Sequence, residues 1–206
     1  MQKFRFYALW LSLICIILFI IQTLIPGFTE STLLLQEKPF EIWRFVTSMF
    51  VHGDIIHLMY NLFALALFGS ILEKVIGSKK FLLVFFASGI FANFMALNFY
   101  SASLGASGAI YGILGALTIM RPGMYVWAFG FPMPMFIAAL LWIGAGVLGL
   151  FMPSNTGHIA HLSGIAIGFI FGIIYRLANR KKIKEKRIEI NEQNLTRWEN
   201  SCMLKR

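Results

Sequence analysis

Apolar stretches long enough to cross a membrane recur along this chain, and they constrain its fold more than any other feature. Six can be read from the sequence, at residues 7–25, 55–72, 81–98, 107–120, 135–152 and 158–177. A helix needs about 20 residues to cross the hydrocarbon core of a bilayer. Hydrophobic residues make up 58% of the chain and charged residues only 13%, about half the charged share of a soluble domain. The sequence therefore predicts an all-α polytopic membrane protein with six transmembrane helices.

Two of these segments need separate interpretation. Segment 7–25 is longer than the apolar part of a secretory signal and is followed by Pro26-Gly27 rather than a small-residue cleavage site, so we expect a retained helix. Segment 107–120 has 14 residues and would span only about 21 Å as a helix. Its first residue should lie below one membrane surface, reached by a descending loop that protein or a water-filled cavity must surround.

Basic residues set the expected orientation. They gather at the N-terminus, near residues 74–80, at Arg121 and in the tail, so the positive-inside rule places both termini in the cytoplasm. We expect a membrane domain over residues 1–178 and a basic cytoplasmic tail over 179–206 that touches anionic lipid. A nucleic-acid partner is disfavoured because nothing else in the chain indicates base or groove recognition. With no transit pattern visible, the plasma membrane is the expected location.

The connection between segments four and five is expected to lie over residues 121–131 on the cytoplasmic side. Tyr125 and Trp127 would lie near the membrane interface there. Pro132 and Pro134 are predicted to mark the start of the fifth helix, because proline is tolerated in a first turn.

Polar side chains inside apolar segments cost free energy, so each marks a candidate functional site. Three groups map to the predicted outer half, and the first contains His52, His57 and Asn61. His57 and Asn61 are four residues apart and share a helix face, although interhelical hydrogen bonding would explain them equally well. Asp54 is expected to cap the helix that carries them.

The second group is Gly105, Ala106, Ser107 and Gly108, with Tyr111 one helical turn further on. Helix packing alone would explain the glycines. Ser107, however, falls where a loop meets the start of a short helix, and the free backbone N–H groups of a helix N-terminus favour a developing anion.

The third group lies on the last segment, where small residues recur every four positions from Ala160 through Gly164 and Gly168 to Gly172. Such a stripe allows close helix contact. His161 lies beside the stripe, and segment 107–120 with its own glycines is the expected neighbour.

Ser107 and His161 suit a nucleophile–base pair, in which the neutral imidazole takes the hydroxyl proton as serine attacks a carbonyl. The usual third member is a buried carboxylate. Asp54 is the only aspartate in the sequence, and the glutamates fall in the outer loop, at cytoplasmic ends or in the tail. A Ser–His dyad is therefore favoured over a triad. His57, Asn61 and the Ser107 backbone N–H are the candidate oxyanion donors.

These motifs together resemble the rhomboid family of intramembrane serine proteases. The resemblance covers about residues 5–178 and rests on motifs in a fixed order: Trp43-Arg44, then His52, His57 and Asn61 as H-x4-H-x3-N, then Gly105–Gly108 as G-x-S-G with Tyr111, and Ala160-His161 before Gly164 and Gly168.

The resemblance implies a function and a set of roles. Ser107 would be the nucleophile and His161 the general base, with His57, Asn61 and the Ser107 main chain as the oxyanion hole. The supporting residues would be His52, which lies behind the site, Tyr111, which stacks on His161, and Trp43-Arg44, which holds the first loop. The fifth helix and the loop at 153–157 would gate entry of a single-pass transmembrane substrate. The family resemblance implies no cofactor and no metal.

Two alternative functions from other classes of protein remain. A non-catalytic membrane chaperone of the same fold would not need both Ser107 and His161. A histidine-based metal transporter would draw on His158 and His161, whose spacing suits shared ligation, but no acidic residue joins them to compensate the charge of the ion. His158 is otherwise expected to satisfy backbone groups at the start of the helix.

Overall fold

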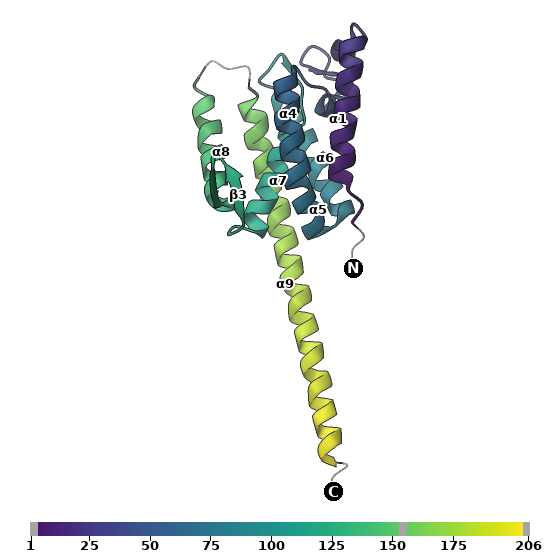
Figure 1. The fold of residues 1–206 in the computed structure, drawn as a ribbon, viewed down its shortest axis with the longest axis vertical. Coiled ribbons are helices and arrows are strands. Elements are labelled where there is room, and N and C mark those ends of the chain that lie inside the picture. The colour runs from purple at the N-terminus through teal and green to yellow at the C-terminus, as the bar shows by residue number, and fades with distance from the viewer. Residues whose placement is uncertain (1–3, 153–155, 204–206) are drawn as a thin grey trace.

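The computed structural model describes residues 4–152 and 156–203 as a bundle made mostly of helices (Figure 1). The long and medium helices are α1 (Tyr7–Leu24), α4 (Ile55–Ala64), α5 (Ser70–Ile76), α6 (Ser78–Leu97), α7 (Ser107–Met120), α8 (Met135–Gly149) and α9 (His158–Met203). The short elements are α2 (Phe28–Thr32), α3 (Arg44–Thr47), the 3-10 helix η1 (Ser48–Phe50), the π-helical turn η2 (Leu65–Gly69), and the strands β1 (Leu34–Leu35), β2 (Ala102–Ser103), β3 (Tyr125–Ala128) and β4 (Phe131–Pro134).

Four helical stretches of the described chain are long and apolar enough to cross a membrane: Tyr7–Leu24, Ile55–Ile76, Ser78–Leu97 and His158–Lys181. The second of them joins α4, η2 and α5. Two shorter apolar helices, α7 and α8, complete the six predicted segments. The bounds of α7 are those predicted from the sequence. The chain is a multi-pass membrane protein by the length and composition of these helices.

Both termini leave the bundle at the same end, which we call the termini end (Figure 1). The opposite, far end carries the starts of α4, α7 and α9. Helix α9 does not end at residue 177 as the apolar segment does. It continues to Met203 and projects well beyond the other helices, and the tail is rich in Lys, Arg and Glu, which have high helix propensity.

The ends of three helices show how the sequence sets these elements. Asp54 caps α4 as predicted, its Oδ1 accepting the backbone N–H of His57 at 2.7 Å. Gly77, at φ 86°, separates α5 from α6 in a conformation that disfavours side chains. The first turn of α1 receives its cap from another helix, because the buried Glu73 carboxylate accepts the N–H groups of Arg5 and Ala8.

Two small antiparallel sheets accompany the helices of this mostly helical fold. Strand β1 pairs with β2, with Leu34 opposite Ser103, and links the first loop to the loop before α7. Strands β3 and β4 form a hairpin that overlaps the connection expected over residues 121–131, for which no strands were predicted. Pro132 and Pro134 lie in β4, and Pro134 is the N-cap residue of α8, so the prolines mark the start of that helix as predicted. Proline is tolerated here because both strands of a two-stranded sheet are edge strands.

Helix α7 lies at the centre of the bundle, between α6 and α9. Most of its residues are buried, from Gly108 to Leu117. The main apolar core surrounds it with side chains of α1, α4, α5 and α6, including Phe81 and Phe85. This short helix is thus well enclosed, which fixes the position of its first residue, Ser107.

Candidate active site

The side chains of Ser107 and His161 meet at the far end of the bundle. Ser107 is the first residue of α7, and His161 lies in the first turn of α9. The Ser107 Oγ lies 2.8 Å from the His161 Nε2. Among the described residues, no carboxylate forms an ion pair or hydrogen bond with His161. The geometry is that of a hydroxyl and an imidazole sharing one proton.

Glycines bring α7 and α9 close enough for this contact. A Cβ on Gly164 would collide with the backbone carbonyl of Gly108, and a Cβ on Gly168 would collide with that of Gly112. Backbone therefore packs against backbone without intervening side chains, as small-residue stripes allow in membrane helices. The contact between the small-residue stripe and the short helix was predicted from the sequence and is confirmed.

Tyr111 lies one turn below Ser107 and covers the imidazole of His161. The two rings are stacked, with centroids 4.3 Å apart and planes 8° from parallel. This stack restricts rotation of the imidazole, so it holds Nε2 toward the hydroxyl. Tyr111 and His161 come together as the sequence motif implied.

The second polar group lies across the cavity from this pair, on α4. The Asn61 side chain is buried and its Nδ2 donates to the carbonyl of His57 at 2.8 Å. An amide has two N–H donors, so one remains for a ligand. The rings of His52 and His57 lie edge to face, 5.1 Å apart. Among the described residues, the ring nitrogens of His52 and the Oδ1 of Asn61 are buried without a hydrogen-bond partner.

Gly105 fixes the loop that leads into Ser107. Its N–H donates to the carbonyl of Ser48 at 2.8 Å, and its φ of 108° lies in a region that disfavours side chains. The ring of His57 packs where a Cβ would stand, 2.7 Å from that position. Glycine at 105 is therefore required both by the backbone conformation and by the neighbouring imidazole.

These groups line one cavity of about 1320 Å³. Its far end is polar and contains Ser107, His161, His57 and Asn61. The cavity then continues toward the termini end between α4, α7 and α8. A polar site of this kind inside an apolar bundle can bind water and an unwound peptide.

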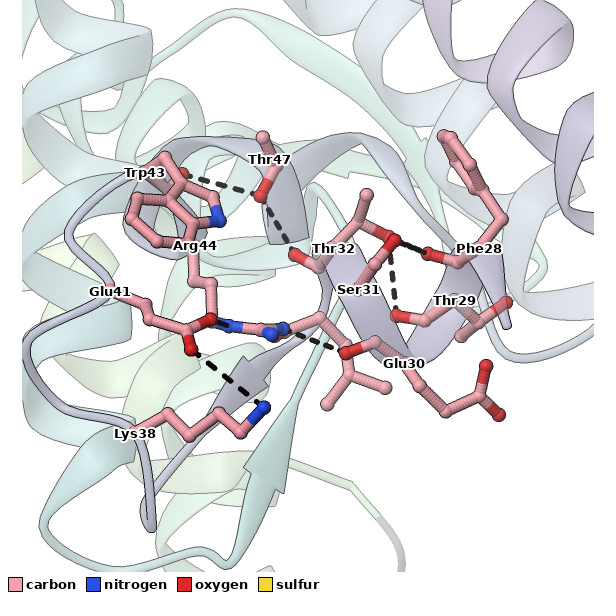
Figure 2. Close-up of polar contacts among 11 residues, drawn as sticks. Phe28, Thr29, Glu30, Ser31, Thr32, Lys38, Glu41, Trp43, Arg44 and Thr47 are labelled. Carbon is pink, nitrogen blue, oxygen red and sulfur yellow. Dashed lines mark hydrogen bonds and ion pairs between the residues drawn. The ribbon is translucent and has the colours of Figure 1, made fainter.

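The Trp43-Arg44 motif lies in the first loop, away from the cavity. The Arg44 side chain is 4% exposed and donates from Nη1 to the carbonyls of Glu30 and Leu33, and from Nε to Glu41 at 2.5 Å (Figure 2). This hydrogen bond from Arg44 lowers the pKa of Glu41 below its ordinary value. Arg44 thus ties three parts of the loop together, while the Trp43 ring remains half exposed.

Sequence reasoning missed several polar residues that support the site. Gln22 on α1 makes two hydrogen bonds with the backbone of His52, one to its carbonyl and one from its N–H. Asn93 on α6 donates to Ser48, whose carbonyl holds Gly105. In the sequence, each of these two residues is an amide side chain within an apolar segment. Such a side chain costs free energy in a membrane unless it has a hydrogen-bond partner, and this could have marked both residues.

His158 begins α9, and its ring lies 6.3 Å from that of His161 at 83°. It packs against Gly149 at the end of α8. In the part of the chain that the structure describes, no three His, Cys, Asp or Glu residues are grouped so that they could hold a metal ion. The predicted gating loop at 153–157 lies largely outside the described residues.

These features define a class of protein: a multi-pass helical membrane protein with a serine and a histidine paired inside the bundle. The model of the Rhomboid domain matches residues 39–178, so the chain belongs to the rhomboid family. It is 29% identical over 175 residues to the Rhomboid protease GlpG of Haemophilus influenzae, covering 81% of this chain and 89% of that protein. Proteins of the same name from Salmonella choleraesuis and Salmonella typhi are 28% identical over 188 residues, covering 84% of this chain and 64% of each.

Proposed function

We propose that this chain is an intramembrane serine endopeptidase that cleaves transmembrane segments with a Ser107–His161 dyad. The observation that carries the proposal is the 2.8 Å contact between the Ser107 Oγ and the His161 Nε2, at the start of a buried helix and inside a cavity. Membership of the rhomboid family and the named protease relatives support it.

The chemistry follows from the positions of the groups. His161 removes the proton from Ser107 as the Oγ attacks the scissile carbonyl, and it then returns that proton to the leaving amine. A water molecule, activated by the same imidazole, hydrolyses the acyl-enzyme and regenerates the serine. The Ser107 backbone N–H, the free amide hydrogen of Asn61 and the ring of His57 stabilise the oxyanion. Stacking on Tyr111 takes over the orienting role that a carboxylate has in a triad.

We further propose that all six apolar helices cross or enter the membrane, with both termini in the cytoplasm and the plasma membrane as the location. The positive charge at the termini end supports this orientation. Residues 1–178 would be the membrane domain, and 179–206 a cytoplasmic tail. Ser107 would then lie below the outer surface, and the polar lining of the cavity would admit water to it.

The substrate would be a single-pass membrane protein. Its segment must unwind locally before cleavage, because an intact helix engages its carbonyls in i→i−4 hydrogen bonds. Small or helix-breaking residues near the cut are therefore expected. The dyad chemistry requires no cofactor.

The test is cleavage of a labelled single-pass substrate by the purified protein in lipid vesicles. Ser107→Ala and His161→Ala should each abolish cleavage while the melting temperature stays near that of the wild type. Ser163→Ala is a matched control, since this hydroxyl lies on α9 close to His161 but donates to the carbonyl of Ile159. It should retain activity. Full activity in Ser107→Ala would disprove the mechanism.

Two further measurements separate the rival functions. Asn61→Ala should lower kcat more than it changes KM, because an oxyanion contact acts in the transition state. A wild-type protein that binds the substrate without cutting it would favour a membrane chaperone. Loss of activity on adding a chelator would favour a metal-dependent protein.

A further inference from the structure

We propose that the β3–β4 hairpin is a specificity element that contacts the part of the substrate's apolar segment beyond the cut. This inference rests on the proposed function and concerns the termini end of the same cavity. Trp127 and Phe129 of the hairpin are the residues that make the contact. They lie apart from Ser107 and His161, so their effect can be separated from catalysis.

The cavity is much longer than the cleavage of one peptide bond requires. On α4 it is lined by His57, Asn61, Ala64 and, in η2, Phe68, which recur every three or four residues and so share one helix face. This face is about 16 Å long from His57 to Phe68 at 1.5 Å per residue. A chain whose scissile bond lies at Ser107 therefore has room to continue along the bundle toward the termini end.

The character of the lining changes along this length. The far end is polar, whereas the termini end is lined by aromatic rings. Trp142 on α8 lies edge to face with Phe68, 6.0 Å away, and 6.1 Å from the ring of Phe129. Trp127 lines the same end and is 65% exposed. An apolar wall of this kind suits the membrane-spanning part of a substrate, not its unwound polar part.

The backbone of the hairpin gives a second, independent observation. Its two-residue loop has φ of 53° at Phe129 and 84° at Gly130, and a loop with two positive φ values favours Asn-Gly. Phenylalanine is therefore conformationally unfavourable at 129, where asparagine would be favourable. The ring is nevertheless placed against Trp142 and into the cavity. A bulky residue held in a costly conformation at a cavity wall points to a function for its side chain.

The occupant is the substrate because this wall is continuous with the proposed catalytic end. One cavity contains both Ser107 and Trp127, so a segment bound at one end extends along the other. The hairpin thus adds binding energy to the part of the substrate that does not react, which lowers KM for long apolar segments.

The experiment compares two substrates that share the cut site, in lipid vesicles with the whole protein. One is a single-pass protein with a full apolar segment, and the other ends a few residues past the cut. Trp127→Ala and Phe129→Asn should raise KM for the full substrate by about five- to tenfold, the value of one aromatic contact. Neither should change KM for the short substrate, and kcat should stay constant for both.

The chain offers controls for folding. Phe129→Asn suits the turn better than the native residue, so it should fold at least as well while losing the ring. Tyr125→Ala removes an aromatic side chain from the same face of β3, 71% exposed and outside the cavity lining. It should leave KM unchanged for both substrates.

Three results would overturn the inference. The first is an equal rise in KM for the long and short substrates, which would indicate a general structural effect or a lipid chain in the groove. The second is no rise in KM for either substrate. The third is a rise in KM in Tyr125→Ala equal to that in Trp127→Ala and Phe129→Asn. Cleavage of neither substrate by the wild type would instead disprove the proposed function, and the inference with it.

Discussion

Replacing Gly105 with alanine should damage catalysis by displacing the neighbouring imidazole of His57. The new Cβ would lie 2.7 Å from Cε1 and 2.8 Å from Nε2 of His57, whereas carbon atoms pack at about 3.5 Å or more. The imidazole must therefore withdraw by about 0.7 Å or more. Because φ is 108°, the backbone also becomes strained, at a cost of about 1–3 kcal/mol in stability.

His57 is proposed as an oxyanion donor, so its withdrawal should act on the transition state. Misplacement of about 1 Å can cost roughly 10²-fold in rate, and loss of one oxyanion donor costs about 10²–10³-fold in kcat. We expect kcat to fall about 10²-fold, equivalent to about 2.7 kcal/mol. KM should change little, because the contact is absent from the ground state.

The assay is steady-state cleavage of a fluorescent single-pass substrate in vesicles, with the melting temperature measured on the same samples. Gly123→Ala is the matched control, because a Cβ there meets nothing within 4 Å. It should leave both kcat and stability unchanged. A Gly105→Ala protein with wild-type kcat would refute the argument that His57 must lie against this glycine.

Three other changes test separate parts of the structure. Gly164→Ala would push a Cβ into the backbone carbonyl of Gly108. Overpacking of this kind should lower stability by about 1–3 kcal/mol and reduce cleavage, as measured by melting and turnover. Arg44→Ala should expose the first loop to protease at neutral pH. In the wild type the pKa of Glu41 is lowered from its ordinary value of 4.5, so its carboxylate stays charged above pH 4.5. The ion pair between Glu41 and Arg44 is lost only as the pH falls below that value. Burial lowers the pKa of His52 to about 4 from 6.5, so the unfolded chain takes up a proton in this window that the folded protein does not. Stability should fall as pH drops from 6.5 to about 4, and His52→Leu should weaken this dependence in melting curves.

The parts of the fold that could be predicted are those where one physical rule dominates. Helix α7 begins and ends where the apolar segment does, because a loop polar enough to leave the helix precedes Ser107 and a charged residue follows Met120. The stripe of glycines on α9 identified its neighbour, since backbone contact needs small residues on both helices.

The parts that could not be predicted depend on contacts between distant segments. The hairpin at 125–134 contains aromatic residues and prolines that also suit an irregular interfacial loop, so no local period indicated strands. Gln22, Asn93 and Glu73 were not identified as supports because their partners are 30 or more residues away. The continuation of α9 to Met203 was not predicted, because the basic charge of the tail was used only to predict on which side of the membrane it lies.

The packing around His161 in the described part of the chain disfavours a third catalytic residue beside the proposed Ser107–His161 dyad. A buried carboxylate must be satisfied by several donors, and Glu73 shows what this requires: two backbone N–H groups at the start of α1 and the hydroxyl of Ser78. The surroundings of His161 are different, because the ring of Tyr111 covers one face of the imidazole and glycine backbone brings α7 directly against α9. A carboxylate there would replace the stack that orients the ring. Close glycine packing between α7 and α9 therefore favours the proposed dyad over a Ser–His–Asp triad.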